Sequence, residues 1–258
     1  MFTYINSPLD QFEIQTLMGF QTPFMNLSNL NITTFTIFSL MLLLVVLFLY
    51  LLPSNNIIGS KWMVFHEVIY DTMMNMTKNM VTSETSKDNK GMYYFPLIYT
   101  FFVFIMLANM LSLIPYTFSL TSNFMFIISL SFTVWLGMTI LGLYQHGLVF
   151  FSLFIPHNTP LVLVPLLVMI ELLSYVARAI SLGLRLSVNN TAGHLLLSIL
   201  SGLLFNFMSI SLITFILGFM PLLAILAIFF LEIAIGLIQS YVWSILTASY
   251  LKDALYLH

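Results

Sequence analysis

Long apolar stretches separated by short polar ones dominate this chain. A transmembrane helix requires about 20 mostly apolar residues to cross a hydrocarbon core about 30 Å thick, and residues 35–52 supply the first stretch of that kind. Residues 92–144 contain two more, divided by Pro115 and Tyr116. The pattern therefore predicts one N-terminal span after an N-terminal segment (residues 1–34), and later a hairpin of two spans.

Residues 60–80 have a different pattern, because apolar and polar side chains recur at helical spacing on opposite faces. The apolar face holds Trp62, Phe65, Ile69, Met73 and Met76, and the polar face holds Glu67, Asp71, Asn75 and Lys78. The stretch is too polar to span, so it predicts an amphipathic helix that lies in the membrane interface. The polar residues 81–91 that follow predict an aqueous loop.

The last part of the chain, residues 160–256, contains two apolar tracts that are longer than a span needs, at residues 161–200 and 222–251. A helix of about 40 residues is about 60 Å long, about twice the thickness of the hydrocarbon core. Either each tract breaks, or both helices are steeply tilted. The first tract has no proline after Pro165, which favours tilt. Residues 1–258 are therefore predicted to form a single all-α membrane domain that ends in two long tilted helices.

Composition agrees with a membrane protein, since the chain is 60% hydrophobic and 6% charged, against about 25% charged residues in soluble domains. Scattered basic residues give no nucleic-acid surface, and the absence of Cys excludes disulfides and thiolate metal sites. The N-terminus has neither a secretory signal nor an Arg-rich transit peptide. Four of the seven basic residues lie between the first and second spans, which predicts a matrix, cytoplasmic or stromal location for that loop.

Charged residues are rare after residue 91, and those in the two long tracts are expected at membrane depth. They are Glu171, Arg178 and Arg185 in the first tract and Glu232 in the second. A central arginine costs about 2.5 to 3.5 kcal/mol on insertion scales, so its presence calls for a reason. The first three are spaced by seven residues, which places them on one side of a helix.

Arg185 differs from the other charges in this group. Glu171 and Arg178 are spaced to pair with each other or to fasten neighbouring helices, but no carboxylate lies within a turn or two of Arg185. We therefore expect its counter-ion on another molecule. A guanidinium stays protonated and cannot relay protons, whereas His194 and Glu232 can exchange them. A fixed positive charge beside titratable groups predicts a proton path with a block in it.

Lines of small residues on both tracts predict close helix packing. Ala179, Gly183 and Ser187 form one line, and Gly236, Ser240, Ser244 and Ala248 form the other. We expect the two lines to pack on each other or on a partner helix.

Two motifs carry a resemblance to a known family. The strings SLGLRLSVNNTAGH (residues 181–194) and EIAIGLIQSYVWSILTASYL (residues 232–251), together with SPLDQFEI and FVFIMLANMLSLIPY earlier in the chain, resemble the a subunits of F-type ATP synthases, with the mitochondrial pattern of His194 and Glu232. The likeness covers nearly the whole chain. Ser187-Val188 departs from the family's bulky-Gly pair, and the amide at Asn189 is doubled by Asn190.

The resemblance implies a function in the mitochondrial inner membrane. Arg185 would face a ring of c subunits, attract each deprotonated ring carboxylate and separate two offset half-channels. Protons would be taken up past His194 and Glu232 and released near Glu171, and the chain itself would perform no ATP chemistry. The further residues expected on the path are Gln239 and Asp253 on the uptake side, Asn189 near Arg185, and Arg178. The expected partners are the c-ring, peripheral-stalk and small membrane subunits and the lipid bilayer, with no cofactor, metal or nucleic acid.

Two other classes of function compete with this interpretation. A self-contained secondary transporter or ion channel would hold its substrate site within one chain, with broken helices in two related halves, and no such repeat is evident in the sequence. A purely structural subunit of a respiratory complex would carry its buried charges incidentally. The four histidines outside the long tracts (His66, His146, His157 and His258) are expected to be interfacial.

Overall fold

The computed structural model describes residues 9–18, 32–51, 61–81, 89–114, 117–155, 163–210, 215 and 217–256. Nearly all of these residues are helical, which confirms the predicted all-α fold class. Four helical stretches in the described part are long and apolar enough to cross a membrane, namely Gly91–Ser112, Phe124–Ser152, Val164–Ser209 and Phe219–Leu255.

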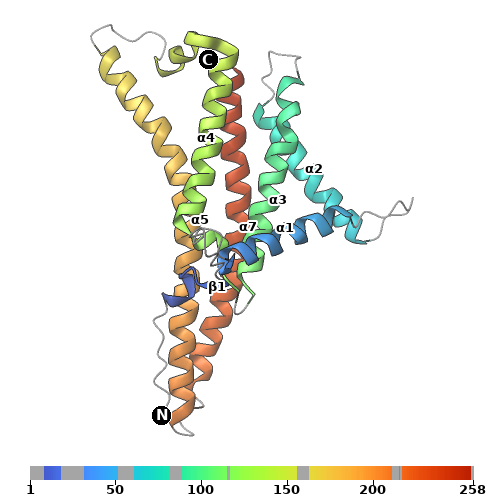
Figure 1. Cartoon of the computed structure of the whole chain (residues 1–258), viewed down its shortest axis with the longest axis vertical. Helices are drawn as coiled ribbons and strands as arrows, with labels where there is room; N and C mark the ends of the chain where they lie inside the picture. The colour runs from blue at the N-terminus through green and yellow to red at the C-terminus, as the bar shows by residue number, and fades with distance from the viewer. Residues whose placement is uncertain are drawn as a thin grey trace, which may run out of the picture. The chain divides into compact units, whose positions relative to one another are not determined.

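Six α-helices follow one another along the described chain (Figure 1). They are α1 (Thr34–Leu51), α2 (Lys61–Val81), α3 (Phe95–Ser112), α4 (Phe124–His146), α5 (Val164–Ile210) and α7 (Phe219–Leu255). Four short 3-10 helices connect or precede them: η1 (Asp10–Phe12), η3 (Asn89–Tyr94), η4 (Leu120–Ser122) and η5 (Gly147–Phe154). A small antiparallel pair of strands, β1 (Thr16–Met18) and β2 (Ile32–Thr33), leads into α1.

The connections differ more from expectation than the helices do. Of the expected loop at 81–91, residues 82–88 lie outside the described part, and the residues that follow form η3. The stretch after α4 forms η5, which the sequence pattern did not predict. Gly147 begins η5 with φ at 57°, a conformation that glycine adopts without the steric penalty of a side chain.

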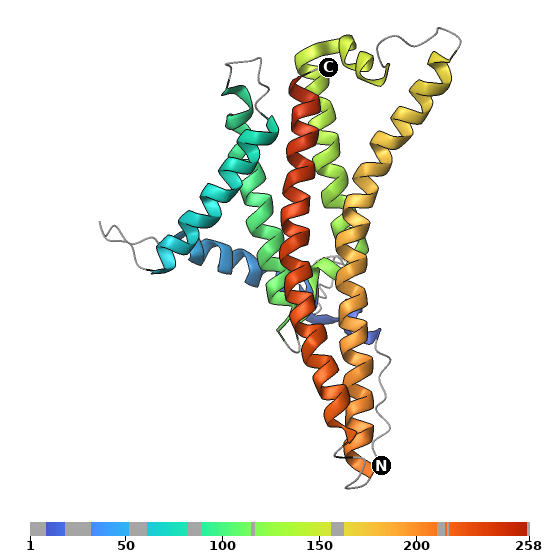
Figure 2. The same ribbon diagram turned by 180° about the vertical axis from the view of Figure 1, so that it is seen from behind.

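Both long tracts form unbroken helices. Helix α5 has 47 residues and α7 has 37, which correspond to about 70 Å and about 55 Å at 1.5 Å per residue. Both helices are continuous coils in Figures 1 and 2, so the alternative in which each tract breaks is excluded. Because both lengths exceed the hydrocarbon thickness of about 30 Å, neither helix fits the core upright.

Contacts divide the chain into two compact units. The first unit comprises Met1–Leu51, Ile105–Phe124 and Leu186–Ile238, and the second comprises Leu52–Phe104, Met125–Arg185 and Gln239–His258. Helices α3, α5 and α7 each contribute residues to both.

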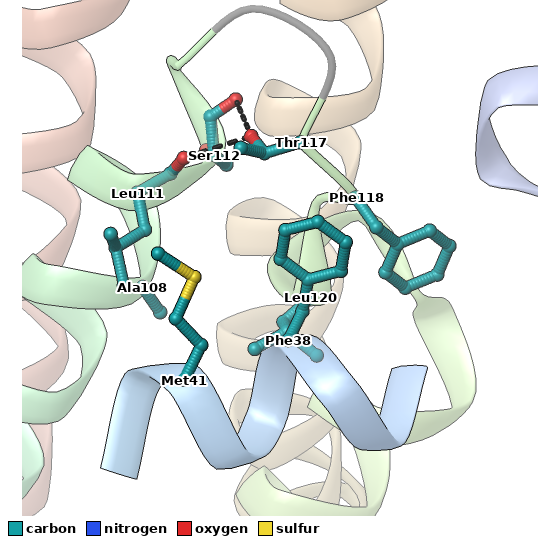
Figure 3. Close-up of a pocket in the computed structure, with 8 residues that line it drawn as sticks. All are labelled: Phe38, Met41, Ala108, Leu111, Ser112, Thr117, Phe118 and Leu120. Carbon is teal, nitrogen blue, oxygen red and sulfur yellow. Dashed lines mark hydrogen bonds between the residues drawn. The ribbon is translucent and has the colours of Figure 1, made fainter. Parts of the chain in front are cut away.

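In the first unit, the turn after α3 is fastened to α1. The ring of Phe118 packs at 6.4 Å from Phe35 and 6.3 Å from Phe38, measured between ring centres. Thr117 Oγ1 donates to the Leu111 carbonyl at 2.9 Å and so closes the end of α3. The same residues border a small, mostly apolar hollow (Figure 3), lined by Phe38, Met41, Ala108, Leu111, Ser112, Thr117, Phe118 and Leu120. The turn that leads into η4 is therefore held from two sides.

In the second unit, η5 folds back onto α5 through aromatic packing. Phe150 and Phe154 are buried with Tyr175, and the rings of Phe154 and Tyr175 lie 5.8 Å apart. Tyr175 also contacts Tyr250 of α7, with 6.3 Å between ring centres. These contacts join η5, α5 and the end of α7.

Helix α2 is amphipathic, and it packs beside α3 in the second unit. Tyr70 meets Phe95 edge to face at 5.1 Å, and the α2 side chains Met73 and Met76 are buried. Trp62 and Phe65 are about half exposed, at 52% and 51%. Large apolar side chains left uncovered next to polar ones suit a helix at a lipid interface, which stays the prediction for α2.

The two lines of small residues pack against the α3–α4 region. A Cβ on Gly183 would lie 2.7 Å from Ser131 Oγ and 3.3 Å from the Ile127 carbonyl oxygen, both on α4. A Cβ on Gly236 would lie 3.2 Å from Asn109 Cβ on α3. Of the two expected arrangements, packing on each other or on a partner helix, these positions show the second, because helical spacing identifies a narrow face but not its neighbour.

The close approach at Gly183 generates a stability prediction. Gly183→Val should separate α5 from α4, because the Ile127 carbonyl belongs to the backbone and has little freedom to move. We expect a loss of about 1 to 3 kcal/mol, measured as a lower thermal melting midpoint and a lower yield of the purified protein. Gly137→Val is the matched control, since a Cβ there meets no atom within 4 Å. Equal melting midpoints for the two variants would contradict the packing described.

Candidate functional site

The carboxyl group of Glu232 lies against Gly193, where α5 and α7 run side by side in the first unit (Figure 2). A Cβ placed on Gly193 would lie 2.7 Å from Glu232 Cδ and 2.8 Å from Glu232 Cγ, so the carboxyl occupies the space that a larger residue would fill. Glu232 is 6% exposed, and neither of its oxygens has a hydrogen-bond partner among the described residues. A buried carboxyl without a partner is costly unless it is protonated or hydrated, so this position suits proton exchange.

His194 is the residue that follows Gly193 on α5. Its Nε2 atom is buried and has no hydrogen-bond partner in the part of the chain that the structure describes. The ring contacts Phe12 of η1 edge to face, with 6.4 Å between ring centres. The first unit thus contains two titratable side chains with unsatisfied polar atoms, one on each long helix.

Asn109 of α3 is a polar residue in this region that the motif analysis did not select. It is 3% exposed, and its Nδ2 donates to the carbonyl of Gly236 at 3.1 Å, while its Oδ1 is buried without a partner among the described residues. Gly236 lies one turn after Glu232 on α7. The signal in the sequence was the lone amide within the apolar string FVFIMLANMLSLIPY.

A polar turn contacts the segment of α5 between Arg185 and His194. Ser187 Oγ donates to the Ser122 carbonyl at 3.1 Å, and Thr191 Oγ1 donates to the same carbonyl at 3.4 Å. Asn190 Nδ2 donates to Thr121 Oγ1. Asn189, which the resemblance places on the path, is partly exposed and takes no part in these bonds. Three polar side chains of α5 thus meet η4.

Arg185 has an exposed side chain and, among the described residues, no carboxylate within ion-pair distance. Arg178 is different, because its Nη2 atom lies 3.6 Å from Glu171 Oε1 and its Cζ atom lies 5.9 Å from the centre of the Tyr175 ring. Of the two alternatives for Glu171 and Arg178, pairing with each other or fastening neighbouring helices, the structure shows the first. Arg185 is left as a fixed cation without a counter-ion in the described chain.

Asp253 lies in the second unit, where it interacts electrostatically with Tyr175 and Tyr250. It is about 30 Å further along α7 than Glu232, so the structure does not bring these two carboxyl groups together. Arg178 and Glu171 belong to the same unit as Asp253. Gln239, which is partly exposed, begins the α7 part of this unit.

The two other described histidines, His66 and His146, take part in packing and in one contact to a carbonyl. His146 Nε2 lies 3.1 Å from the Leu255 carbonyl oxygen at the end of α7, and His66 packs edge to face on Trp62 with 5.4 Å between ring centres. His157 and His258 lie outside the described residues. Within the described ranges, no group of three His, Asp or Glu side chains has the arrangement needed to hold a metal ion.

Comparison with known proteins gives a consistent result over nearly the whole chain. The profile of the family described as ATP synthase A chain matches residues 33–252. A protein of Saccharomyces cerevisiae named ATP synthase subunit a is 62% identical over 99% of this chain and 98% of its own length. Proteins of the same name from Kluyveromyces lactis and Wickerhamomyces canadensis are 60% and 59% identical, over 99% and 98% of this chain and 98% of each relative.

The contact between the Glu232 carboxyl and Gly193 predicts the effect of adding one methyl group to α5 at this position. Gly193→Ala should displace the Glu232 carboxyl or push α5 away from α7, with a loss of about 1 to 3 kcal/mol, seen as a lower melting midpoint of the purified protein. Gly202→Ala is the control on the same helix, because a Cβ there meets no atom within 4 Å, and the change favours helix by about 1 kcal/mol. A Gly193→Ala protein as stable as Gly202→Ala would show that Glu232 does not depend on this space.

Proposed function

Because the chain belongs to the ATP synthase A chain family, we propose that its two long helices present two offset proton half-channels to a ring of c subunits and that Arg185 separates them. Membership itself makes the chain the proton-translocating subunit of the membrane sector of ATP synthase. Its yeast relatives and its membrane-spanning helices make it a multi-pass protein of the mitochondrial inner membrane.

The observation that carries the proposal is the guanidinium of Arg185, which has no ion-pair partner among the described residues. The side of α5 that carries Arg185 also holds exposed apolar side chains, among them Val188 at 48% and Leu196 at 50%. A cation on an apolar helix is unfavourable in a membrane unless an anion or water compensates it. A passing c-ring carboxylate would supply that anion, and a permanent cation would bar a proton from crossing directly between the half-channels.

Uptake of protons is assigned to His194 and Glu232. Their polar atoms lack protein partners among the described residues, so water is the natural partner for each, and both groups can gain and release a proton. Asn189, on the segment between Arg185 and His194, and Gln239, two turns after Glu232, would extend this path. From Glu232 the proton would pass to a carboxylate of the ring.

Release of protons is assigned to the Glu171 end of α5. Its pairing with Arg178 and the presence of Asp253 in the same unit favour a role for Asp253 on this side, in place of the uptake role that the resemblance implied. Proton flow between the two sides requires nearly a full turn of the ring. That rotation would drive ATP formation in a soluble head that this chain does not touch.

Removal of the fixed cation tests the proposal. In the complete ATP synthase reconstituted in liposomes, Arg185→Ala should abolish ATP-driven proton pumping and raise passive proton leakage, because the block between the half-channels is gone. Val188→Ala, on the same exposed side of α5, is the neutral control and should pump normally. Pumping by Arg185→Ala at the rate of the control would refute the proposal, and transport by the isolated chain would favour a self-contained channel.

Removal of one titratable group tests the uptake path. Glu232→Gln keeps the size of the side chain but cannot exchange a proton, so passive proton flow through the membrane sector should fall at least about tenfold, in keeping with the share of a proton-transfer group in catalysis. The flow is measured in membranes from which the soluble head has been removed, with assembly checked on native gels. Unchanged flow would reduce Glu232 to a packing residue.

A further inference from the structure

Five residues of the first unit form what we term the polar clamp: Ser187, Asn190 and Thr191 on α5, and Thr121 and Ser122 on η4. Ser187, Thr121 and Ser122 are 0%, 1% and 5% exposed. The Ser122 carbonyl accepts from both Ser187 and Thr191, and Thr121 Oγ1 accepts from Asn190. Thr191 Oγ1 has one proton, which it donates mainly to the Ser187 carbonyl at 2.7 Å and shares with the more distant Ser122 carbonyl at 3.4 Å, so Ser187 makes the stronger contact across to the turn.

The turn is itself held rigidly. Ser122 Oγ donates to the Ser119 carbonyl at 2.7 Å, and Ser119 Oγ bonds to Ser122 Oγ. Both serines are buried. The acceptor that α5 meets is therefore a carbonyl fixed by its own local bonds.

The clamp residues lie on the side of α5 that is opposite Arg185. At about 100° per residue, Ser187, Asn190 and Thr191 stand about 200°, 140° and 240° around the helix from Arg185. Their mean direction is within about 20° of the point diametrically opposite. The burial of the side chains agrees with these angles, since Ser187 is fully buried and Arg185 is exposed.

Apart from the close packing of Gly183 on α4, few contacts near Arg185 can fix the rotation of α5. Arg185 has no ion pair among the described residues, and packing of aliphatic side chains is not directional. Hydrogen bonds are directional, and breaking them in a low-dielectric interior leaves polar groups unsatisfied. A small rotation of α5 would break the contacts to the Ser122 carbonyl and swing the guanidinium sideways.

We propose that the polar clamp is a positioning device for Arg185, which sets the rotation of α5 so that the guanidinium faces away from η4. The mechanical part of this inference concerns the helix alone. Its consequence for proton transport rests on the function proposed above for Arg185.

A spin label tests the rotation directly. Ala192 is exposed and lies seven residues after Arg185, on the same side of α5, and the chain has no native Cys, so Ala192→Cys carries a label that reports the direction of that side. In the reconstituted complex, Ser187→Ala and Thr191→Val should each change the collision rate of the label with dissolved oxygen by about twofold or more. The matched control is Ser198→Ala, whose hydroxyl bonds only to the Leu195 carbonyl of its own helix.

Transport is measured in the same clamp variants without the label. Loss of one hydrogen bond corresponds to about a two- to tenfold change in an equilibrium, so ATP-driven pumping should fall by about that factor while the assembled amount stays constant. Passive proton leakage should rise, which a merely structural contact would not cause. Thr191→Ser keeps the hydroxyl and should restore pumping to the level of Ser198→Ala.

The outcomes separate this inference from the proposed function. The inference would be overturned if Ser187→Ala and Thr191→Val had the same oxygen collision rate and the same pumping rate as Ser198→Ala. This holds whatever the result for Arg185→Ala. If Ser187→Ala does not assemble, Thr191→Val decides, because valine has nearly the size of threonine. Normal pumping by Arg185→Ala together with a changed label signal would overturn the proposed function and leave the clamp standing.

Discussion

A permanent positive charge without a partner in the described part of its own chain is the constraint on which this account of the molecule depends. Glu171 and Arg178 satisfy each other at 3.6 Å, but Arg185 has no such partner among the described residues and stands among exposed apolar side chains. Such a cation is unfavourable in lipid unless an anion or water compensates it. In the proposed mechanism, the polar clamp sets the direction of this charge, and the titratable groups His194 and Glu232 deliver protons to the carboxylates that it attracts.

The two long helices divide the chemistry between two places. Glu232 and His194 belong to the first unit and have unsatisfied polar atoms, whereas Glu171, Arg178 and Asp253 belong to the second unit. Arg185 stands on α5 between Glu171 and His194. Along α5, the order is therefore Glu171, Arg185 and His194. The two proposed half-channels require this order, with the cation between the two groups of titratable residues.

The helices themselves followed from the sequence, since apolar length and the positions of proline decide where a span begins and ends. The helix expected at residues 35–52 is α1 and that at 60–80 is α2, each within one residue over the described range. The strand pair β1–β2 and helix η5 were not predicted, because short connections depend on local contacts such as the packing of Phe150 on Gly142. Periodicity showed that Gly183 and Gly236 lie on narrow faces but not that those faces meet α4 and α3.

The site was predicted in part. Arg185, His194 and Glu232 stood out as charged or titratable residues in apolar tracts, but the contact of Glu232 with Gly193 and the amide of Asn109 depend on three-dimensional packing. Ser187 was noted as a small residue and as a departure from the family pattern, and Asn190 only as a departure, but both bond to η4.

The most direct test of the account is a density map of the assembled membrane sector at a resolution that shows side chains. The account predicts that the Arg185 guanidinium faces the c-ring and comes within about 4 Å of a ring carboxylate, the usual limit of an ion pair. A guanidinium neutralised by a carboxylate of this same chain, or turned toward η4 and away from the ring, would contradict it.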